Sequence, residues 1–176
     1  MDDCYVLFVR TGDEDKIQRA IAAKLNADLF LPFVPKKAMM FKRQGVFNKV
    51  YRVCFPSYVF ILSVFPAPEF LDRMFPVIYP IKEAYRFLHY GDNRRDVALR
   101  ENERLSLLHM FGENFAIECP VGVVEGDMVQ IISGSFIGTE GKVRKIILRK
   151  REVVIDIPFL GGIKPLTLGL DLIEKV

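Results

Sequence analysis

Six basic residues stand between positions 142 and 151 with no acidic residue among them: Lys142, Arg144, Lys145, Arg149, Lys150 and Arg151. Lysine and arginine bind phosphate groups, and arginine can also pair with base edges. The run Arg149-Lys150-Arg151 falls at the tip of an expected hairpin, where side chains project away from a core. The pattern therefore indicates binding of a structured RNA, whose loops and bulges expose base edges. The alternative is a solvated cationic turn, because runs of like charge are commonly just exposed faces.

A second basic stretch runs from Lys36 to Arg52, inside a segment, Leu29 to Pro68, that contains no acidic residue. Its basic residues are interleaved with apolar ones around Gln44-Gly45, which predicts a hairpin that projects from a sheet. Contacts with the phosphates of a nucleic acid would then fall to a set of four residues: Lys36, Lys37, Lys42 and Arg43. The alternative is that these charges only keep an exposed strand edge soluble.

Catalytic chemistry is not indicated by the remaining reactive side chains. The two histidines, His89 and His109, have no serine, cysteine or paired carboxylate at a recognisable spacing, and no glycine-rich phosphate loop is present. Cys4, Cys54 and Cys119 are scattered, without the spacing of a zinc site or a disulfide framework. We therefore expect neither an enzyme nor a metal or cofactor site.

An apolar strand is predicted at the centre of the chain, in the uncharged run from Val53 to Pro68. Pro56 cannot donate a ladder hydrogen bond, so the regular strand should begin after it, at Tyr58. Alternation would place Tyr58, Phe60 and Leu62 on one face and apolar residues on the other. Helices can cover one face, and an uncovered aromatic face would be a binding surface. The alternative for any apolar strand is a place in the core.

The elements around this strand predict an α+β domain. Strands are expected at 4–9, 29–34 and 84–89, and the hairpin joins the central strand. A helix should begin at a capping box formed by Thr11 and Glu14 and end near Asn26. A second helix should begin at Pro66-Ala67-Pro68 and end at Pro76, with four residues facing inward: Phe70, Leu71, Met74 and Phe75. A last helix, 100–111, should turn one side inward: Leu105, Leu108 and His109.

The C-terminal quarter changes structural class. Five short segments separated by glycines predict strands at 127–132, 141–148, 152–158, 163–168 and 172–176. A sheet this small would leave its edges exposed, which favours a small β-barrel. We therefore predict an N-terminal domain, 1–111, composed of an antiparallel sheet flanked by helices; a linker, 112–121; and an all-β domain, 122–176.

Composition places the chain among soluble globular proteins. Its 176 residues are 51% apolar and carry 25 basic against 22 acidic residues, a formal charge of +3. The first residues lack the basic segment of a signal peptide, and the longest uncharged run is shorter than the roughly 20 residues of a spanning helix. The sequence thus predicts a protein that does not enter a membrane, and the scattered cysteines suit the reducing cytoplasm. We also expect a monomer.

The segment from Glu125 to Val143 resembles a KOW motif, and Gly141 stands where that motif keeps a glycine for a tight turn. A KOW-like stretch alone would also suit some ribosomal proteins. Preceded by Tyr5-Val6-Leu7 and by Phe55-Pro56-Ser57-Tyr58-Val59, it resembles the NusG family of transcription elongation factors. The resemblance implies an N-terminal NGN domain, 1–111, and a C-terminal KOW barrel of the Tudor-like kind, 122–176.

Within that family the basic run after the KOW glycine resembles the specialised paralogues, in particular the LoaP-type antiterminators. Gly138-Thr139-Glu140-Gly141 is followed by Lys-Ile and then by Arg149-Lys150-Arg151. Three residues depart from the family: Cys4 where tryptophan is common, Ser57 in place of glycine, and Ile147 where the paralogues often have aspartate.

The resemblance also implies partners. In the family the NGN domain docks an apolar concavity onto the clamp helices of RNA polymerase and opposes pausing and termination. By position that concavity would comprise Phe8, Phe55, Tyr58, Phe60 and Phe87, at least one of which we expect in the core. The four basic residues of the hairpin would lie near upstream DNA or the polymerase. For a specialised paralogue, the KOW barrel would bind a leader RNA hairpin. For a housekeeping member, it would bind the ribosome or a termination factor.

Overall fold

The chain forms two compact units. The computed structural model describes residues 1, 3–125, 128–135, 137 and 142–174. The first unit comprises residues 1–35 and 55–104, and the second comprises residues 36–54 and 105–176. Each unit is discontinuous in sequence, because the segment between the second and third strands of the first unit belongs to the second.

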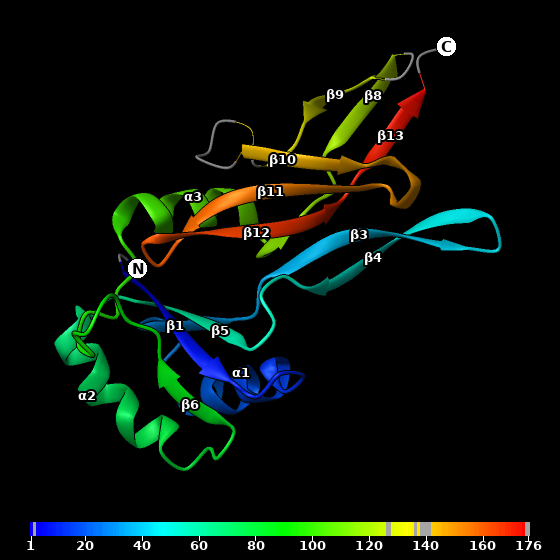
Figure 1. The fold of residues 1–176 in the computed structure, drawn as a ribbon. Coiled ribbons are helices and arrows are strands. Elements are labelled where there is room, and N and C mark those ends of the chain that lie inside the picture. Colours follow the sequence, from blue (N-terminus) through cyan, green and yellow to red (C-terminus); the bar gives the residue numbers. More distant parts are fainter. Residues whose placement is uncertain (2, 126–127, 136, 138–141, 175–176) are drawn as a thin grey trace. The chain divides into compact units, whose positions relative to one another are not determined.

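A four-stranded antiparallel sheet forms the first unit (Figure 1), with the strand order β2-β5-β1-β6. Its strands are β1 (Asp3–Val9), β2 (Phe30–Phe33), β5 (Tyr58–Ser63) and β6 (Ala84–Phe87). The central strand starts at Tyr58 as predicted, and β1 and β5 occupy the two inner positions. Both are apolar on both faces, which is typical of strands that lie at the centre of a sheet.

Two helices connect parallel strands of this sheet. Helix α1 (Glu14–Ala22) links β1 to β2, and helix α2 (Ala67–Ile78) links β5 to β6. Right-handed crossovers place both helices on the same face, and Figure 1 draws both below β1 and β5. Tyr5 of β1 stacks on Phe70 of α2 with ring centroids 3.5 Å apart, so α2 covers the face that carries Tyr5.

Two predictions about helix α2 are wrong. Helix α2 continues through Pro76 to Ile78, because a proline near the end of a helix removes only one late hydrogen bond, and Tyr79 N–H still donates to Phe75 O at 2.9 Å. Phe75 is 67% exposed, since the buried stripe runs through Phe70, Met74 and Ile78 at a spacing of four.

The predicted capping box is also replaced by another arrangement. Asp13 is the N-cap residue of α1 and makes no side-chain cap bond. The buried carboxylate of Glu14 instead accepts hydrogen bonds from Gly12 N–H, at 2.9 Å, and from Ser57 N–H, at 2.7 Å. The acid at the start of the helix therefore fixes a distant loop, which spacing along the sequence does not reveal.

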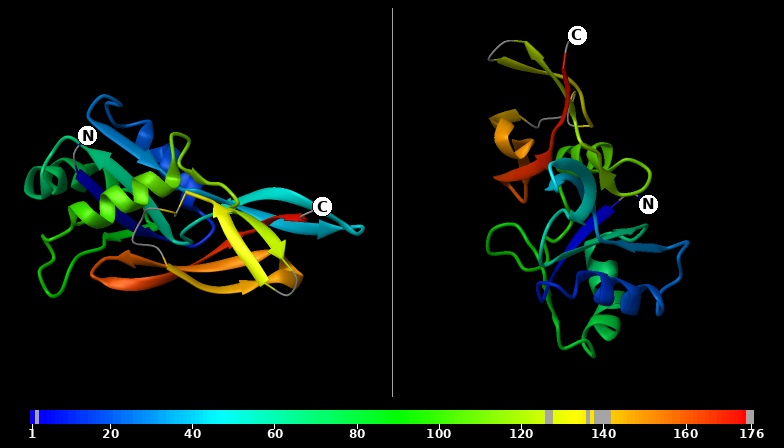
Figure 2. Two further views of the ribbon diagram at one scale, coloured as in Figure 1. Left: turned by 90° about the horizontal axis from the view of Figure 1, so that it is seen from above. Right: turned by 90° about the vertical axis from the view of Figure 1, so that its right-hand side faces the viewer.

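The second unit begins with the predicted hairpin, strands β3 (Lys36–Arg43) and β4 (Val46–Val53). Gln44 and Gly45 both have positive φ, 50° and 85°, as a two-residue hairpin turn requires. Figure 2 shows the hairpin as a long two-stranded arm. Strand β7 (Ala116–Ile117), inside the predicted linker, pairs in parallel with the base of β3 and buries Ile117.

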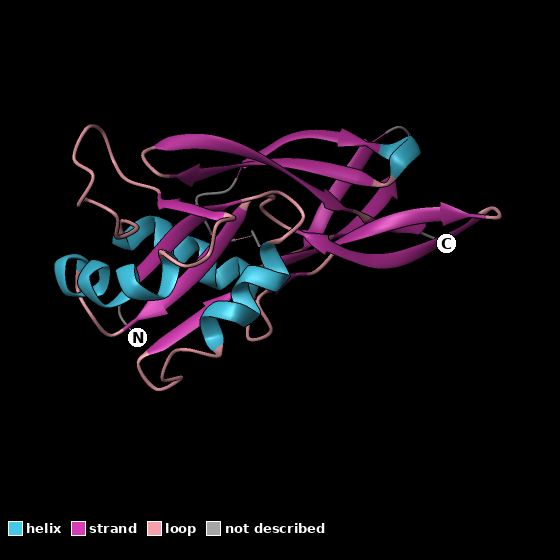
Figure 3. Cartoon of the chain, turned by 90° about the horizontal axis from the view of Figure 1, so that it is seen from below, coloured by secondary structure: helices cyan, strands magenta, loops and turns pink. Residues whose placement is uncertain are grey.

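Six further strands complete the second unit, in the sheets β10-β11-β12 and β13-β8-β9. They are β8 (Val121–Glu125), β9 (Met128–Ser133), β10 (Lys142–Ile147), β11 (Glu152–Phe159), β12 (Gly162–Gly169) and β13 (Asp171–Glu174). Figure 3 shows that this region is almost entirely strand, with one helical turn, η1 (Leu148–Lys150). Val153, Ile155 and Ile157 alternate inward on β11, while Gly141 lies outside the described residues.

Helix α3 (Glu101–Phe111) begins in the first unit and ends in the second. The predicted inward face is wrong: Leu107, Met110 and Phe111 are buried, whereas Leu105 is 55% exposed. Apolar residues occur on more than one side of this helix, so their pattern does not select a face. Among the described residues, no helix is long and apolar enough to cross a membrane.

The division into units differs from the predicted domains 1–111 and 122–176 with a linker at 112–121. Residues 36–54 and 105–121 belong to the second unit. The physical reason is strand pairing and packing, since β3 pairs with β7 and contacts β12. The α+β class is confirmed, with helices against an antiparallel sheet and a separate region of short strands.

Candidate functional site

Three partly exposed aromatic rings meet at one end of the sheet in the first unit. Phe8 and Tyr58 are cross-strand partners, and their ring centroids lie 6.3 Å apart in an edge-to-face arrangement. Tyr85 of β6 lies 5.3 Å from Phe8 and is 53% exposed. We call these three residues the aromatic cluster. Large rings with accessible faces and few rotatable bonds are the residues that dominate protein–protein interfaces.

The five residues predicted for this surface do not form one patch. Phe8 and Tyr58 meet in the aromatic cluster, but Phe55 and Phe60 are fully buried, with ring centroids 5.5 Å apart. Phe87 is half-buried on the face covered by α2, where it contacts the Phe70 ring at 5.0 Å. Tyr85 was not among the predicted residues, although its place in the expected strand 84–89 was a usable signal.

The loop before Tyr58 is held in an unusual conformation. Ser57 has a φ of +71°, a region that favours glycine, which is the residue the NusG resemblance expects here. Its N–H donates to Glu14, its hydroxyl bonds Thr11, and its carbonyl accepts from Val9 N–H at 2.8 Å. These bonds hold the backbone that presents Tyr58, despite the strain of a side chain at positive φ.

A cavity of about 600 Å³ lies between α2 and β6 in the same unit. Its lining is mostly apolar: Leu71, Asp72, Phe75, Ile78, Tyr79, Ala84, Tyr85, Phe87 and Arg94. Asp72 and Arg94 are the charged groups of this lining, and no nucleophile with a neighbouring base is among these residues. The cavity therefore lacks the paired groups from which an acid–base or nucleophilic site is built.

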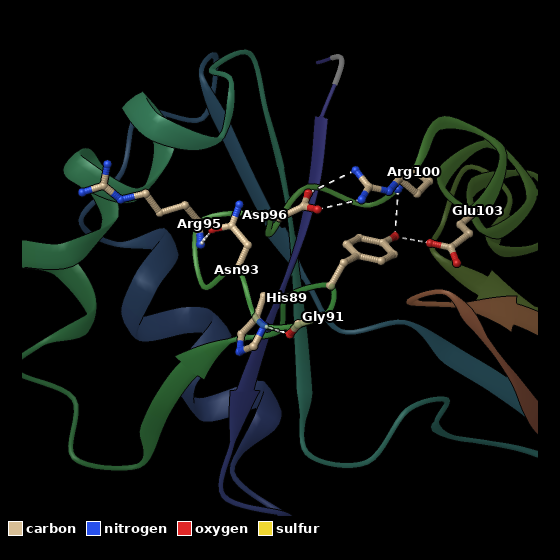
Figure 4. A network of polar contacts seen from close by, with 8 residues as sticks. His89, Gly91, Asn93, Arg95, Asp96, Arg100 and Glu103 are labelled. Carbon is tan, nitrogen blue, oxygen red and sulfur yellow. Dashed lines mark hydrogen bonds and ion pairs between the residues drawn. The ribbon is translucent and has the colours of Figure 1, made fainter.

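His89 belongs to a structural loop rather than to a reactive pair (Figure 4). Its Nδ1 lies 3.0 Å from the carbonyl oxygen of Gly91. Beside it, the Tyr90 hydroxyl donates to Glu103 and accepts from Arg100 N–H at 2.9 Å, and burial raises the pKa of Tyr90. Arg100 also pairs with Asp96 at 2.6 Å. This network connects the start of α3 to the loop after β6.

Burial disfavours the thiolate form of the three cysteines. Burial raises the pKa of the Cys4 and Cys54 thiols to about 12 and that of Cys119 to about 11. All three are free thiols, and a thiol with a raised pKa is a poor nucleophile and metal ligand. In the part of the chain that the structure describes, no group of three or more His, Cys, Asp or Glu residues could hold a metal ion.

The four basic residues predicted on the hairpin fall into two pairs. Lys36 and Lys37 are half-buried at its base, and burial lowers the pKa of Lys37. Lys42 and Arg43 are exposed beside the turn. The second pair is therefore the more accessible of the two. The basic residue nearest the middle of β4, Lys49, is paired with Glu118 at 2.9 Å.

The six basic residues of the barrel also differ in their surroundings. Arg144 forms an ion pair with Asp156 on the neighbouring strand, with 2.8 Å between Nε and Oδ1. The Arg151 guanidinium lies over the ring of Phe47, 4.4 Å from its centroid. The other four are exposed: Lys142, Lys145, Arg149 and Lys150. The predicted tip is present, since Arg149 and Lys150 form the turn η1 between β10 and β11.

Comparison with known proteins gives a consistent result. A family model described as NusG, transcription termination factor nusG, matches residues 2–108. The transcription termination/antitermination protein NusG of Streptococcus pyogenes is 25% identical over 158 residues, which cover 86% of this chain and 85% of that protein. The NusG protein of Thermus thermophilus is 24% identical over 180 residues, which cover 97% of this chain and 97% of that protein.

A solved structure, described as domain interaction in Thermotoga maritima NusG, has a similar fold. It aligns with a TM-score of 0.50 and 22% sequence identity, covering 95% of this chain and 93% of that one. The family model spans more than half of the chain, including the complete four-stranded sheet of the first unit. The chain therefore belongs to the NusG family of transcription termination and antitermination factors.

Proposed function

We propose that this chain is an antitermination and elongation factor that binds the clamp helices of RNA polymerase and suppresses pausing and termination. The observation that carries the proposal is the aromatic cluster, which is partly exposed at the end of a sheet whose two inner strands are mostly buried. Solvent-accessible aromatic groups of this kind suit the apolar side of a partner helix. Membership in the family of transcription factors supports the same partner.

The polymerase surface consists of Phe8 and Tyr58, joined by Tyr85. Phe87 lines the neighbouring cavity together with Tyr85 and contributes at its edge. Phe55 and Phe60 act indirectly, because both rings are fully buried and pack against each other, which supports the strand that carries Tyr58. The protein works in the cytoplasm as a monomer, without a cofactor, and makes no chemical change in its partners.

The specialised part of the function is assigned to the barrel. It binds a hairpin in the leader RNA of particular operons, as in LoaP-type factors, and so recruits the protein to those transcripts. Lys142, Lys145, Arg149 and Lys150 support this role through their exposure, and Arg151 lies beside them. Arg144 contributes less, since Asp156 already neutralises it.

A general housekeeping factor is the second candidate function. Two of the six basic residues of the barrel are engaged within the protein, Arg144 by Asp156 and Arg151 by Phe47. A barrel with fewer available cations is better suited to a protein partner, such as a ribosomal protein or a termination factor. The two functions differ in whether activity depends on the leader RNA.

Transcription in vitro across an intrinsic terminator distinguishes the two. Templates with the native leader, with a scrambled leader and without a leader are transcribed by RNA polymerase in the presence of the full chain. We expect readthrough to rise only with the native leader. Equal readthrough on all three templates would establish the general factor, and no change on any template would contradict both functions.

RNA binding is measured separately by gel-shift titration of the full chain against the native and scrambled leaders. The double variant Arg149→Glu with Arg151→Glu should lose the preference for the native leader. Lys16→Glu with Lys24→Glu, two exposed residues of the first unit, is the charge-matched control and should retain it. If wild type binds both RNAs equally, the attraction is electrostatic and unspecific.

A further inference from the structure

The hairpin β3–β4 is docked against the barrel within the second unit, and a glycine sets the contact. Gly169, at the end of β12, lies where a Cβ atom would be 2.7 Å from Met40 N, 2.8 Å from Met39 Cα and 2.7 Å from Cys119 Sγ. Real Cβ atoms essentially never approach other atoms so closely. The backbone of β3 therefore crosses β12 at a point that only glycine accommodates without displacement.

Polar contacts extend this docking along the hairpin. The carboxylate of Glu118 accepts hydrogen bonds from Lys49 Nζ, at 2.9 Å, and from the Tyr51 hydroxyl. Lys49 and Tyr51 share one face of β4, because alternate residues of a strand point the same way. The hydrogen bond from Tyr51 lowers the pKa of Glu118, with a further contribution from Lys49, so the carboxylate is ionised at neutral pH.

Phe47 continues this face of the hairpin toward the turn, where two cations share its ring. The Arg151 guanidinium, from the barrel, is 4.4 Å from the ring centroid, and the Lys42 ammonium, from the facing strand, is 5.6 Å from it. Lys42 and Phe47 are cross-strand partners, which explains their shared face. The tip of the hairpin and the β10–β11 connection thus meet at one aromatic ring.

The surroundings of this ring are strongly basic. Arg43 follows Lys42 in the hairpin, and Arg149 and Lys150 precede Arg151 in the barrel. Residues 36–53 and 142–151 contain no acid, and the nearest one in sequence is the half-buried Glu152. Among the residues that the structure describes, Lys42, Arg43, Arg149 and Lys150 form no ion pair with an acidic side chain.

We infer that the hairpin tip and the barrel tip, joined by the contact of Arg151 with Phe47, form one composite RNA-binding surface, in which the exposed residues Lys42, Arg43, Arg149 and Lys150 contact phosphates. The unpaired bases of an RNA loop stack on aromatic faces, while successive phosphates require several cations at close spacing. A single basic turn supplies the second requirement only, and the two tips together supply both. This inference rests on the proposed RNA binding by the barrel and extends the RNA site to the hairpin.

The composite surface gives the hairpin a partner different from the upstream DNA that the family resemblance implies. A rigid duplex offers phosphates but no unstacked base for Phe47. A loop nucleotide offers both groups. The hairpin then contributes to affinity for RNA and to its dependence on an unpaired loop.

The test uses the full chain and stem-loop RNAs selected by it from a library with a constant stem and a randomised loop. Affinity is measured by fluorescence anisotropy over a range of salt concentrations. Three variants are compared with wild type: Lys42→Ala with Arg43→Ala, Phe47→Leu, and Arg149→Glu with Arg151→Glu. The control is Lys16→Ala with Lys24→Ala, and circular dichroism verifies that each variant is folded.

We expect Lys42→Ala with Arg43→Ala to weaken binding about tenfold at physiological salt and to reduce the salt slope by about 1.4, since each contact to a single-stranded phosphate contributes about 0.7. Phe47→Leu should weaken binding with little change in slope, because it removes stacking but no charge. The control pair should bind like wild type. This combination of results supports the composite surface.

Other outcomes separate the failure of this inference from the failure of RNA binding itself. If the barrel variant loses binding while the two hairpin variants bind like wild type, the barrel alone is the RNA site and the composite surface is wrong. If no variant loses binding, RNA recognition by the barrel is wrong as well. Hairpin variants that lose affinity for duplex DNA, but none for the stem-loops, would assign the hairpin to DNA and overturn the inference.

Discussion

The two units of the chain present opposite surface chemistry, an aromatic cluster in the first and a cationic hairpin and barrel tip in the second. In both units, residue type alone overestimates the number of residues that can contact a partner. Phe55 and Phe60 are aromatic but fully buried, and Arg144 is cationic but paired with Asp156. A residue can contact a partner only when the fold neither buries its side chain nor pairs it with another group of the protein.

The difference lies in what removes a residue from the surface. In the first unit, burial among other aromatic rings removes Phe55 and Phe60. In the second, pairing with an acid or a ring engages Arg144 and Arg151 while much of Arg144 remains in solvent. Substitutions in the first unit should therefore divide sharply into effects on stability and effects on binding, whereas those in the second should be graded.

The largest effect is expected from Phe60→Ala, a substitution that tests whether Phe60 belongs to the core or to the binding surface. Removing a fully buried ring leaves a cavity and should lower the free energy of unfolding by about 3–5 kcal/mol. Urea denaturation followed by circular dichroism measures it. Tyr58→Ala, on the same face of β5 but half-buried, is the control and should lower the free energy of unfolding much less. Equal losses would mean that the two rings are not divided between core and surface.

Next in size is the loss of polymerase binding in Phe8→Ala and Tyr58→Ala. A truncated aromatic anchor costs about 2 kcal/mol or more at an interface, so binding should weaken at least tenfold. Biolayer interferometry with immobilised RNA polymerase measures the dissociation constant. Val64→Ala, an exposed apolar residue just after the other end of β5, is the control. Normal binding by both cluster variants, with the control unchanged, would remove the aromatic cluster from the polymerase interface.

Gly169→Ala tests how closely the backbone of β3 approaches β12 in the second unit. The new methyl group would overlap the backbone of β3, so we expect a loss of about 1–3 kcal/mol in the free energy of unfolding. Gly162→Ala, at the other end of β12, has its nearest neighbouring atom at 3.8 Å and serves as the control. Thermal denaturation of both variants tests this, and equal stability would show that the hairpin does not cross β12 so closely.

A smaller effect is expected at Ser57, which positions the loop before the aromatic cluster. Ser57→Gly and Ser57→Ala both remove the hydroxyl that bonds Thr11, so their difference isolates the cost of a Cβ atom at φ +71°. The glycine variant should be more stable by about 0.5–1 kcal/mol, after allowance for the greater freedom of glycine in the unfolded chain. Equal midpoints in urea would argue against a strained conformation.

The smallest effect concerns Glu118, and it depends on pH. Because its pKa is lowered in the folded protein, the carboxylate stabilises the fold above its ordinary pKa of 4.5, and this contribution is lost as pH falls through the lowered value. Wild type should therefore exceed Glu118→Gln slightly in stability at pH 7, and the difference should vanish in acid. Urea midpoints between pH 7 and pH 3 measure it. A difference that grows in acid would contradict the lowered pKa.

Local patterns in the sequence were sufficient for most of the elements. The turn at Gln44-Gly45, the start of β5 at Tyr58 and the alternation along β11 each depend on neighbours within a few residues. Period-two patterns and turn residues carry their information locally, so they predict strands and hairpins before any tertiary contact is known. The α+β class and the family resemblance followed from the same kind of information.

Only the tertiary structure decided which residues of these elements are free to contact a partner and which are engaged within the fold. Glu14 is engaged by Ser57, Arg144 by Asp156 and Arg151 by Phe47, and these partners are 43, 12 and 104 positions apart. The face of α3 and the place of Gly169 against β3 depend equally on segments remote in sequence. Burial and pairing energies arise from atoms brought together by the whole fold, so a residue's type and immediate neighbours do not determine them.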